Sequence, residues 1–398
     1  MNKPHIAILF LGVGNLRGGG GAERLYADVF EKHHLVNEPR VRLSLIVDDD
    51  SFNHLREINK LCDNKNIYKI DVKKIIFKGI YLAKKIGRWC DDNEVDVIHI
   101  PLISPKYLFY LWGAGIIFGR KKPKISIAQV DANLVYGYND KNNRRGLEQY
   151  KSIFLHWIFF NTTHLDGIFT WYKNFSDFSQ NIRICGKPLV RSARFCFVDS
   201  DRYKPSVKKH KKIVFAARMV ESKRPLLFIH AVNNAVKNNP EIFNEWHFDM
   251  YGDGVLLHEV EKKIISLGLQ EWITVHSGKD LENVFAESSI FVSTQEKENF
   301  TSLSMLEAMS SGNAIVAFDV GQTRIFVHEG ANGLLAHDSL FESISDVLTD
   351  LLSRPNDIIK FSKNSRDIVL NEQCALNFIN DIENYWCDVH DAKKNSFY

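Results

Sequence analysis

Short apolar runs alternate with longer stretches of helical spacing along the first half of the chain. The runs cover residues 5–12, 41–49, 95–101, 124–131 and 165–171. Short apolar runs that end in turn residues predict buried strands, and strands that alternate with helices predict βαβ units with a parallel sheet. We therefore expect the first half to fold as a Rossmann-like α/β domain.

A polar and basic stretch, VDSDRYKPSVKKHKK at residues 198–212, interrupts this alternation and predicts an interdomain linker. The apolar runs then resume at residues 213–219, 246–254, 272–278, 288–294 and 313–319. We expect an α/β protein of two Rossmann-like domains with parallel sheets, over residues 1–197 and 213–375, and a C-terminal helix over residues 376–398 that packs on the first domain. Ligands of such sheets bind beyond the carboxyl ends of the strands, so two facing domains place a cleft between two sets of loops.

Composition adds the class of protein to this picture. With 398 residues, of which 45% are hydrophobic and 25% charged, the chain suits two soluble globular domains. The net charge of +3 and the absence of nucleic-acid-binding motifs argue against a nucleic-acid partner. The six cysteines are scattered, without Cys-x-x-Cys pairs or histidines at zinc-ligand spacing, and no secretory signal opens the chain. We expect a cytoplasmic protein without a structural metal.

Four glycines stand directly before a segment of helical spacing, in LRGGGGAERLYADVF at residues 16–30. Glycine lets a ligand approach the main chain, and a helix N-terminus offers free N–H groups and the positive end of the helix dipole. The stretch predicts a site for an anionic or sugar-like ligand, and a loop without a ligand is the alternative. The stretch is not a Walker loop, because that motif requires Gly-Lys-Ser/Thr after its glycines and this chain has Ala22, Glu23 and Arg24. It is not a dinucleotide-binding fingerprint either, because Arg17 occupies the position of that motif's third glycine.

The predicted loops of the second half carry the most specific pattern. Arg218 follows the first strand of this half, Lys223 lies five residues further on, and the next strand ends in YGDG at residues 251–254. Further along, Glu298 precedes a Glu-Ala-Met sequence that begins at Glu307. Together with GGGGAERL near the N-terminus, these motifs resemble those of the retaining glycosyltransferase family four, which has the GT-B fold and uses nucleotide-diphosphate sugars.

The resemblance implies a role for each matching position. Arg218 and Lys223 would grip the pyrophosphate of the donor, and Glu307 would accept hydrogen bonds from the ribose hydroxyls. The charge that develops on the leaving diphosphate would also be met by amides at the start of the helix that contains Glu307. The other candidate donor-binding positions are Gly20, Gly21, Gly252, Thr301, Ser302 and Leu303.

The chain departs from the family pattern at two catalytic positions. The family's first glutamate, which contacts the donor sugar, falls on Asn299 when counted back from Glu307, because this chain has eight residues between its glutamates. One possibility is that the loop carries one inserted residue and Glu298 contacts the sugar. The other is that Asn299 contacts the sugar. The family's usual histidine after the fourth strand of the first domain is missing, and Asp131 stands in that stretch. We take Glu298, Asn299 and Asp131 as the candidate catalytic residues.

Several of these positions also have a structural explanation. The alternative for Arg218 and Lys223 is that they are charged side chains in solvent without a ligand. The alternative for Gly252 is that it only allows the chain to turn. Glu307 is alternatively the far end of a capping box that begins at Ser304. His99 lies one strand too early to replace the missing histidine and is more simply a histidine of the core.

Residues 72–89, VKKIIFKGIYLAKKIGRW, predict a basic amphipathic helix, and residues 109–124 and 142–160 repeat the mixture of aromatic and basic side chains. None of these segments is long enough to span a bilayer, which takes about 20 apolar residues. The helices either cover a Rossmann sheet with cationic outer faces or dock on an anionic membrane surface.

The motifs together predict a metal-independent, retaining glycosyltransferase that moves a sugar from a UDP- or GDP-sugar to a saccharide. We expect this acceptor to be lipid-linked and to belong to surface-polysaccharide or lipopolysaccharide assembly at the inner face of the membrane. No cofactor is expected beyond the nucleotide sugar. Two alternatives stay open. One is an epimerase or phosphorylase of the same fold, and the other is a donor-binding subunit without chemistry, which the missing histidine and the shifted glutamate suggest.

Overall fold

The computed structural model forms two compact units, and each is described by itself. One unit comprises Met1–Phe195 with Leu376–Tyr398, and the other comprises Cys196–Ala375. The structure describes residues 3–11, 21–57, 66–71, 78–101, 123–129, 160–161, 164–171, 188–276, 281–299 and 302–392.

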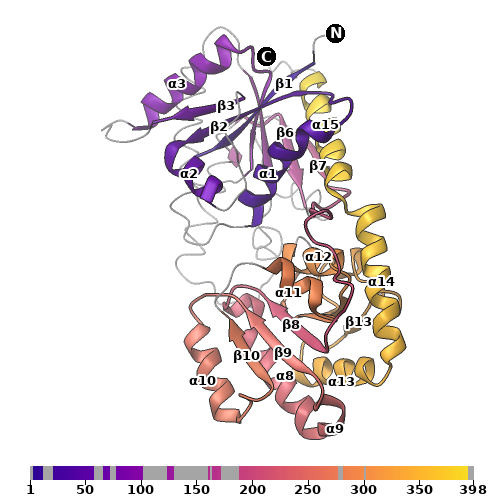
Figure 1. The fold of residues 1–398 in the computed structure, drawn as a ribbon. Coiled ribbons are helices and arrows are strands. Elements are labelled where there is room, and N and C mark those ends of the chain that lie inside the picture. The colour runs from indigo at the N-terminus through magenta and orange to yellow at the C-terminus, as the bar shows by residue number, and fades with distance from the viewer. Residues whose placement is uncertain are drawn as a thin grey trace. The chain divides into compact units, whose positions relative to one another are not determined.

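The first unit is built on a parallel sheet with the strand order β3-β2-β1-β4-β5-β6-β7 (Figure 1). Strand β1 is the third strand in this order, and its Ile8 pairs with Leu45 of β2 on one side and His99 of β4 on the other. Every residue of β1 is buried, as expected for a parallel strand covered on both faces. The strands are His5–Phe10 (β1), Arg42–Asp48 (β2), Ile67–Ile70 (β3), Val97–Ile100 (β4), Lys124–Gln129 (β5), Gly167–Thr170 (β6) and Leu189–Ser192 (β7), and the described helices are Gly21–Lys32 (α1), His33–Leu35 (η2), Asp49–Glu57 (α2), Lys78–Asp92 (α3) and the C-terminal Ala375–Asp391 (α15).

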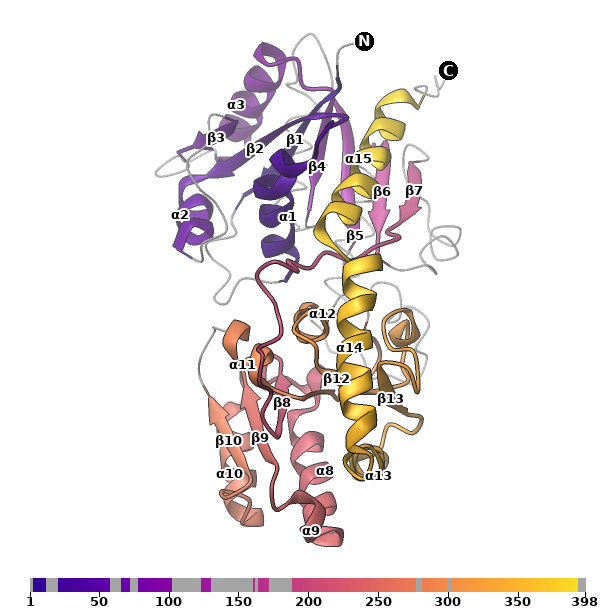
Figure 2. The same ribbon diagram turned by 45° about the vertical axis from the view of Figure 1, so that its right-hand side comes forward.

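Helix α15 comes last in the chain but packs on the sheet of the first unit (Figure 2). The Tyr385 hydroxyl and Ser126 Oγ of β5 share a hydrogen bond of 2.7 Å. At the far end of the helix, Lys124 Nζ donates to the main-chain oxygens of Val389 and His390, both at 2.8 Å, which places a cation at the negative end of the helix dipole. The apolar face of α15 is buried through Phe378, Ile379, Ile382, Tyr385, Trp386 and Val389.

The second unit is built on another parallel sheet, with the order β10-β9-β8-β11-β12-β13. Its core includes a row of aromatic rings, in which Phe228 lies 5.2 Å from Phe215 and 6.1 Å from Phe248 between ring centroids. The strands are Lys212–Ala216 (β8), His247–Tyr251 (β9), Ile273–His276 (β10), Ile290–Ser293 (β11), Ala314–Phe318 (β12) and Gly333–Ala336 (β13), and the helices are Glu221–Lys223 (η3), Pro225–Asn238 (α8), Pro240–Phe243 (α9), Leu257–Leu267 (α10), Leu281–Glu287 (α11), Leu303–Ser310 (α12), Thr323–Ile325 (η4), Phe341–Leu352 (α13) and Pro355–Glu372 (α14).

Residues 198–212, which the sequence presents as a linker, lie within the second unit. The Nζ atom of Lys209 donates to the main-chain oxygens of Phe285, Ser288 and Ser311, at 3.2, 2.6 and 2.7 Å. It therefore ties the end of α11 to the end of α12. Burial lowers the pKa of Lys209 to about 7. The polar and basic composition of residues 198–212 is typical of solvated lysines, and it could not show that Lys209 is the one that is buried.

The expectation of two α/β units with parallel sheets is confirmed by both strand orders. Strands β3, β7 and β13 were not predicted. The first two are not apolar runs, since they read IYKI and LVRS. Cys90, Cys196, Cys374 and Cys387 are free thiols, and the other two cysteines lie outside the described residues.

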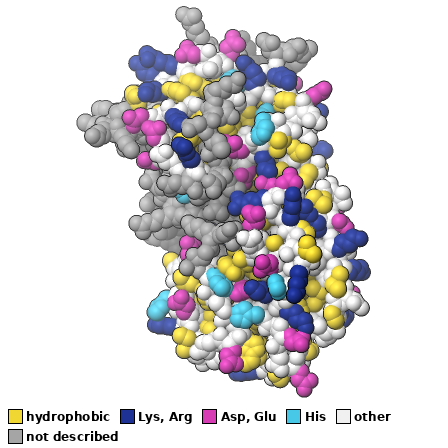
Figure 3. Space-filling view, in the orientation of Figure 1, with side chains coloured by type: hydrophobic (Ala, Val, Ile, Leu, Met, Phe, Trp, Pro, Cys, Tyr) yellow, Lys and Arg dark blue, Asp and Glu magenta, His cyan; other side chains and the backbone are white. Residues whose placement is uncertain are grey.

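The predicted basic helix is described from Lys78 onward, as α3, and residues 72–77 lie outside the described part. Leu82, Ile86 and Cys90 recur at four-residue spacing and are buried, so this apolar stripe packs into the first unit. Lys84 and Arg88 are exposed. On the face shown in Figure 3, cationic and anionic side chains are interspersed. Among the described residues, no helix combines the length and the apolar character that a membrane span requires.

Candidate functional site

The strand order of the second unit reverses between β8 and β11, and ligands of open α/β sheets bind at such a point, beyond the carboxyl ends of the strands. The loops that follow these two strands are joined there. Thr294 Oγ1, just after β11, donates to the main-chain oxygen of Lys223 at 2.8 Å, and Lys223 Nζ donates to Gln295 Oε1. The sheet topology therefore places the candidate site where Lys223 lies.

Two cations meet at this point. Arg218 is exposed and Lys223 is partly buried. Burial, and secondly the positive charge of Arg218, lower the pKa of Lys223 to about 8 from an ordinary 10.5. Within the described part of the chain, no carboxylate pairs with either cation. Like charges held together without an acidic partner suit an anionic ligand.

Two glycines allow the loop that carries Arg218 to pack against the loop after β9. Gly252 and Gly254 both have a φ of 148°, and a Cβ atom at Gly252 would lie only 1.9 Å from the Ala217 main-chain oxygen. The two loops are joined by backbone hydrogen bonds, including Met219 N to Asp253 O at 2.7 Å. Gly252 therefore supports the candidate site through the backbone, whatever else it contacts.

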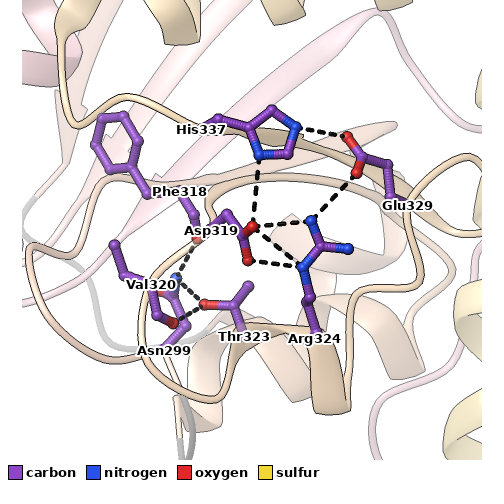
Figure 4. A network of polar contacts seen from close by, with 8 residues as sticks. All are labelled: Asn299, Phe318, Asp319, Val320, Thr323, Arg324, Glu329 and His337. Atoms are coloured by element: carbon purple, nitrogen blue, oxygen red, sulfur yellow. Dashed lines mark hydrogen bonds and ion pairs between the residues drawn. The ribbon is translucent and has the colours of Figure 1, made fainter.

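Glu298 and Asn299 are both buried in the loop after β11, and both reach the loop after β12. Glu298 Oε1 accepts a hydrogen bond from Gln322 N at 2.8 Å. A Cβ atom at Gly321, which has a φ of 54°, would lie 2.4 Å from Glu298 Oε2, so glycine suits this position. Asn299 Nδ2 donates to Thr323 Oγ1 at 2.9 Å (Figure 4). The structure thus brings both candidate residues to the same pair of loops.

Helix α12 begins directly after these residues. Ser302 is its N-cap residue and makes no side-chain capping bond, and Leu306 N is the first amide to donate back, to Ser302 O at 3.1 Å. The amides of Leu303, Ser304 and Met305 therefore lack an acceptor within the helix, as at any helix start. Such a start attracts anions.

Ser304 lies inside α12 and is not its N-cap residue, so the alternative explanation of Glu307 as the far end of a capping box with Ser304 does not hold. Glu307 lies in the middle of this helix and is partly buried.

A polar network at the ends of β12 and β13 was not anticipated. Arg324 donates to both carboxylate oxygens of Asp319, at 2.8 to 3.1 Å, and these bonds lower the pKa of Asp319 (Figure 4). His337 lies 3.4 Å from Asp319 and 3.5 Å from Glu329. Asp319 follows β12, Arg324 lies in η4, Glu329 precedes β13 and His337 follows it, so the network depends on how these short elements fold back on one another.

Arg224 was also missed. It is the N-cap residue of α8 and has a φ of 50°, a left-handed conformation that is uncommon for a residue with a side chain and often marks a functional region. Its guanidinium donates to Ser339 O at 2.9 Å and lies 5.5 Å from the Phe318 ring centroid. It adds a third cationic side chain near the ends of β8 and β12.

The candidate positions of the first unit are only partly described. Gly20 and Asp131 lie outside the described residues, as does Thr301 of the second unit. Gly21 is the first residue of α1, so a helix does begin at the glycine-rich stretch. His99 is buried, with Nδ1 at 3.0 Å from Ser126 Oγ, and burial lowers its pKa to about 3. It is a neutral histidine of the core.

Comparison with known proteins connects the second unit to a family. Residues 210–354 match the family Glycosyl transferases group 1. The chain is 26% identical over 150 residues, 37% of its length, to the UDP-N-acetylglucosamine--peptide N-acetylglucosaminyltransferase GtfA subunit of Streptococcus gordonii. It is 28% identical over 162 residues, 39% of its length, to the poly(ribitol-phosphate) alpha-N-acetylglucosaminyltransferase of Staphylococcus aureus. These alignments span 29% and 31% of the two relatives.

Solved structures extend the likeness to the whole chain. The structure of Anabaena Alr3699/HepE in complex with UDP and glucose superposes with a TM-score of 0.72 over 96% of this chain and 99% of that one, at 15% identity. At this identity the likeness establishes the fold, which is the two-sheet α/β fold of the GT-B glycosyltransferases.

Proposed function

We propose that this protein is a retaining glycosyltransferase that moves a sugar from a UDP-sugar to a saccharide acceptor. The observation that carries the proposal is the pair Arg218 and Lys223, held together at the strand-order reversal without an acidic partner among the described residues. A nucleoside diphosphate carries the negative charge that these cations and the start of α12 would attract. UDP-N-acetylglucosamine is the first donor to test, because the names of two relatives specify N-acetylglucosamine transfer and one of these names UDP.

The proposed chemistry needs positive charge where the diphosphate leaves. As the bond between the sugar C1 and the phosphate oxygen breaks, Arg218, Lys223 and the free amides of α12 would stabilise the charge on the departing phosphate. The acceptor hydroxyl would attack C1 from the face that the diphosphate leaves, and this retains the configuration at C1. The hydroxyl would give its proton to an oxygen of the departing phosphate. We propose that these groups do this work without a metal ion, that Glu307 holds the ribose, and that Glu298 lies nearest the sugar. Gly20, Gly21 and Asp131 are proposed to face sugar and acceptor.

The acceptor and the place of action are separate proposals. We infer a lipid-linked saccharide acceptor, processed at the cytoplasmic face of a membrane in surface-polysaccharide or lipopolysaccharide assembly. The support is the exposed cationic face of α3, where Lys84 and Arg88 lie. The names of the two relatives specify other acceptors, a peptide and poly(ribitol-phosphate), so the acceptor is to be determined by experiment.

A donor-binding subunit without chemistry is the second candidate. It is favoured by one observation: the side-chain amide of Asn299 is fully buried and bonded within the protein, at a position where the resembled family has a sugar-contacting glutamate. Such a protein would bind UDP-sugars but release no UDP with any acceptor. An epimerase would instead convert the sugar of the donor without an acceptor.

Titration with UDP tests the cation pair. Arg218→Ala and Lys223→Ala should each raise the dissociation constant of UDP, because a hydrogen bond to a charged group contributes about 1.5–3 kcal/mol, or roughly tenfold to a hundredfold. Lys237→Ala is the matched control, since Lys237 is exposed in the last turn of α8, at the opposite edge of the sheet. Wild-type affinity in both site variants would refute the proposed site. Transfer of N-acetylglucosamine from the UDP-sugar to saccharide acceptors then tests the reaction.

A further inference from the structure

The side chain of Asn299 is used entirely inside the second unit. Its Oδ1 accepts from Ser293 Oγ at 2.6 Å, and its Nδ2 donates to Phe318 O at 3.2 Å and to Thr323 Oγ1 at 2.9 Å. A side-chain amide has two N–H donors, so both are already engaged. The residue is also fully buried. Its Oδ1 keeps a second lone pair, but because the residue is fully buried a sugar hydroxyl could reach it only if the surrounding side chains moved.

These bonds join three elements at one point. Ser293 ends β11. Phe318 ends β12 and Thr323 begins η4 (Figure 4). The adjacent Glu298 adds a second tie to the same loop through Gln322 N. The loop after β12 is therefore held against the loop after β11 by two consecutive side chains.

The main chain of Asn299 extends this arrangement to the helix. Its carbonyl oxygen accepts a hydrogen bond from Ser302 N at 3.0 Å, and Ser302 is the N-cap residue of α12. The buried side chain of Asn299 and the start of α12 are therefore linked through one main-chain hydrogen bond. The free amides of this helix meet the leaving diphosphate in the proposed function, on which this inference rests.

We propose that Asn299 is a positioning residue: it fixes the start of α12 and the carboxylate of Glu298 through Ser293, Phe318 and Thr323, and it does not contact the donor sugar. The one-residue shift between the two glutamates is then an inserted residue in the loop. Glu298 is left as the acidic side chain at the position nearest the sugar, and Asn299 holds it there.

The test removes the partners of Asn299 and leaves Asn299 itself in place. Ser293→Ala deletes the donor to Oδ1. Thr323→Val deletes one of the two acceptors of Nδ2, together with the hydrogen bond from Thr323 Oγ1 to Val320 O, with little change of shape. Ser293 and Thr323 are both buried. Each variant should lower kcat for sugar transfer about threefold to tenfold, which is what one hydrogen bond contributes. Combining either with Asn299→Ala should give less than the product of the single effects, because all three act through one network.

Ser289→Ala is the matched control. Ser289 also donates a hydrogen bond from a buried hydroxyl, to His210 O at 2.6 Å, but it precedes β11 at the opposite edge of the sheet. It should lower the melting temperature about as much as Ser293→Ala and leave kcat unchanged. This comparison separates positioning from a general loss of stability.

Two results would overturn the inference while wild type is active. If Asn299→Ala abolishes transfer and both partner variants retain wild-type kcat, Asn299 contacts the substrate directly. If all variants lose only melting temperature, the network is structural and positions nothing for the reaction. If wild type turns over no nucleotide sugar with any acceptor, the proposed function fails, and the positioning role fails with it.

Discussion

Lys223 is a cation whose charge depends on its surroundings. Its pKa of about 8 reflects burial and the nearby charge of Arg218. The same two conditions change when a diphosphate binds, because the anion favours the charged lysine and opposes the repulsion between the cations. At the scale of the residue, ligand binding and protonation of Lys223 are therefore linked.

The linkage predicts that UDP binding takes up a proton above pH 8. At pH 9 the free protein holds Lys223 mostly neutral, and the bound diphosphate restores its charge, so affinity should fall as pH rises through 8 and beyond. Isothermal titration at pH 9, in two buffers of different ionisation enthalpy, measures the uptake. Lys223→Arg is the control, since arginine stays charged and any proton exchange by UDP itself is common to both proteins. Equal uptake in the two proteins would contradict this role of Lys223.

Among the elements of the second unit, helices α11 and α12 depend on a lysine that lies far from both in sequence. Lys209 Nζ bonds three main-chain oxygens, those of Phe285, Ser288 and Ser311. The lysine amine lies near the carboxyl ends of two helices and donates to carbonyl groups that helix geometry leaves open. This contact also holds residues 198–212 on the second unit.

Replacing this lysine should loosen both helix ends. Lys209→Met should lower the free energy of unfolding by roughly 2–3 kcal/mol, because buried carbonyl oxygens lose their donor. The pKa of Lys209 is about 7 in the folded protein and an ordinary 10.5 in the unfolded chain. Between pH 7 and 10.5 the unfolded chain therefore holds a proton on Lys209 that the folded protein has lost. The contribution of Lys209 to the free energy of unfolding should therefore rise with pH across this range. Urea unfolding at pH 7 and 9 measures both effects. The exposed neighbour offers a control in Lys208→Met, and equal stability of the two variants would be evidence against the bracing role.

The membrane proposal concerns the whole molecule, because it says that the protein binds an anionic membrane surface. The buried side chains Leu82, Ile86 and Cys90 of α3 belong to the core of the first unit, so they are not available for insertion into lipid. Docking through α3 would therefore use its cationic face. Attraction of this kind is screened by salt within a Debye length of about 10 Å at 0.1 M.

We expect anionic vesicles to sediment the protein at low salt and high salt to release it. Reversal of two exposed charges, Lys84→Glu with Arg88→Glu, should abolish sedimentation and leave UDP binding intact. The matched control reverses two exposed charges of the second unit, Lys262→Glu with Lys360→Glu, and should still sediment. A wild-type protein that stays in solution with anionic vesicles at low salt would rule out the membrane proposal. Binding to neutral vesicles would show that apolar contacts contribute.

Much of the fold was predictable because it depends on local alternation. Ten apolar runs coincide with strands of the two parallel sheets, since a parallel strand that is covered on both faces is apolar along most of its length. Placing Arg218 and Lys223 at the end of β8 followed from the same alternation, because a motif directly after a buried strand lies at the carboxyl edge.

Contacts between distant residues were decided only by the tertiary structure. The sequence determined that Glu298 and Asn299 share a loop. It did not determine which of the two contacts the sugar, because a shift of one residue in the alignment with the family motif exchanges them. Only the hydrogen-bond partners of Asn299 from β12 and η4 show that its side chain faces inward. The same holds for Lys209, whose acceptors lie 76 to 102 residues away. The network of Asp319, Arg324 and His337 joins residues that are closer in sequence, but its contacts still depend on how β12, η4 and β13 are placed. Periodicity reports which face of an element is apolar, whereas hydrogen-bond partners depend on which loops the completed sheet brings together.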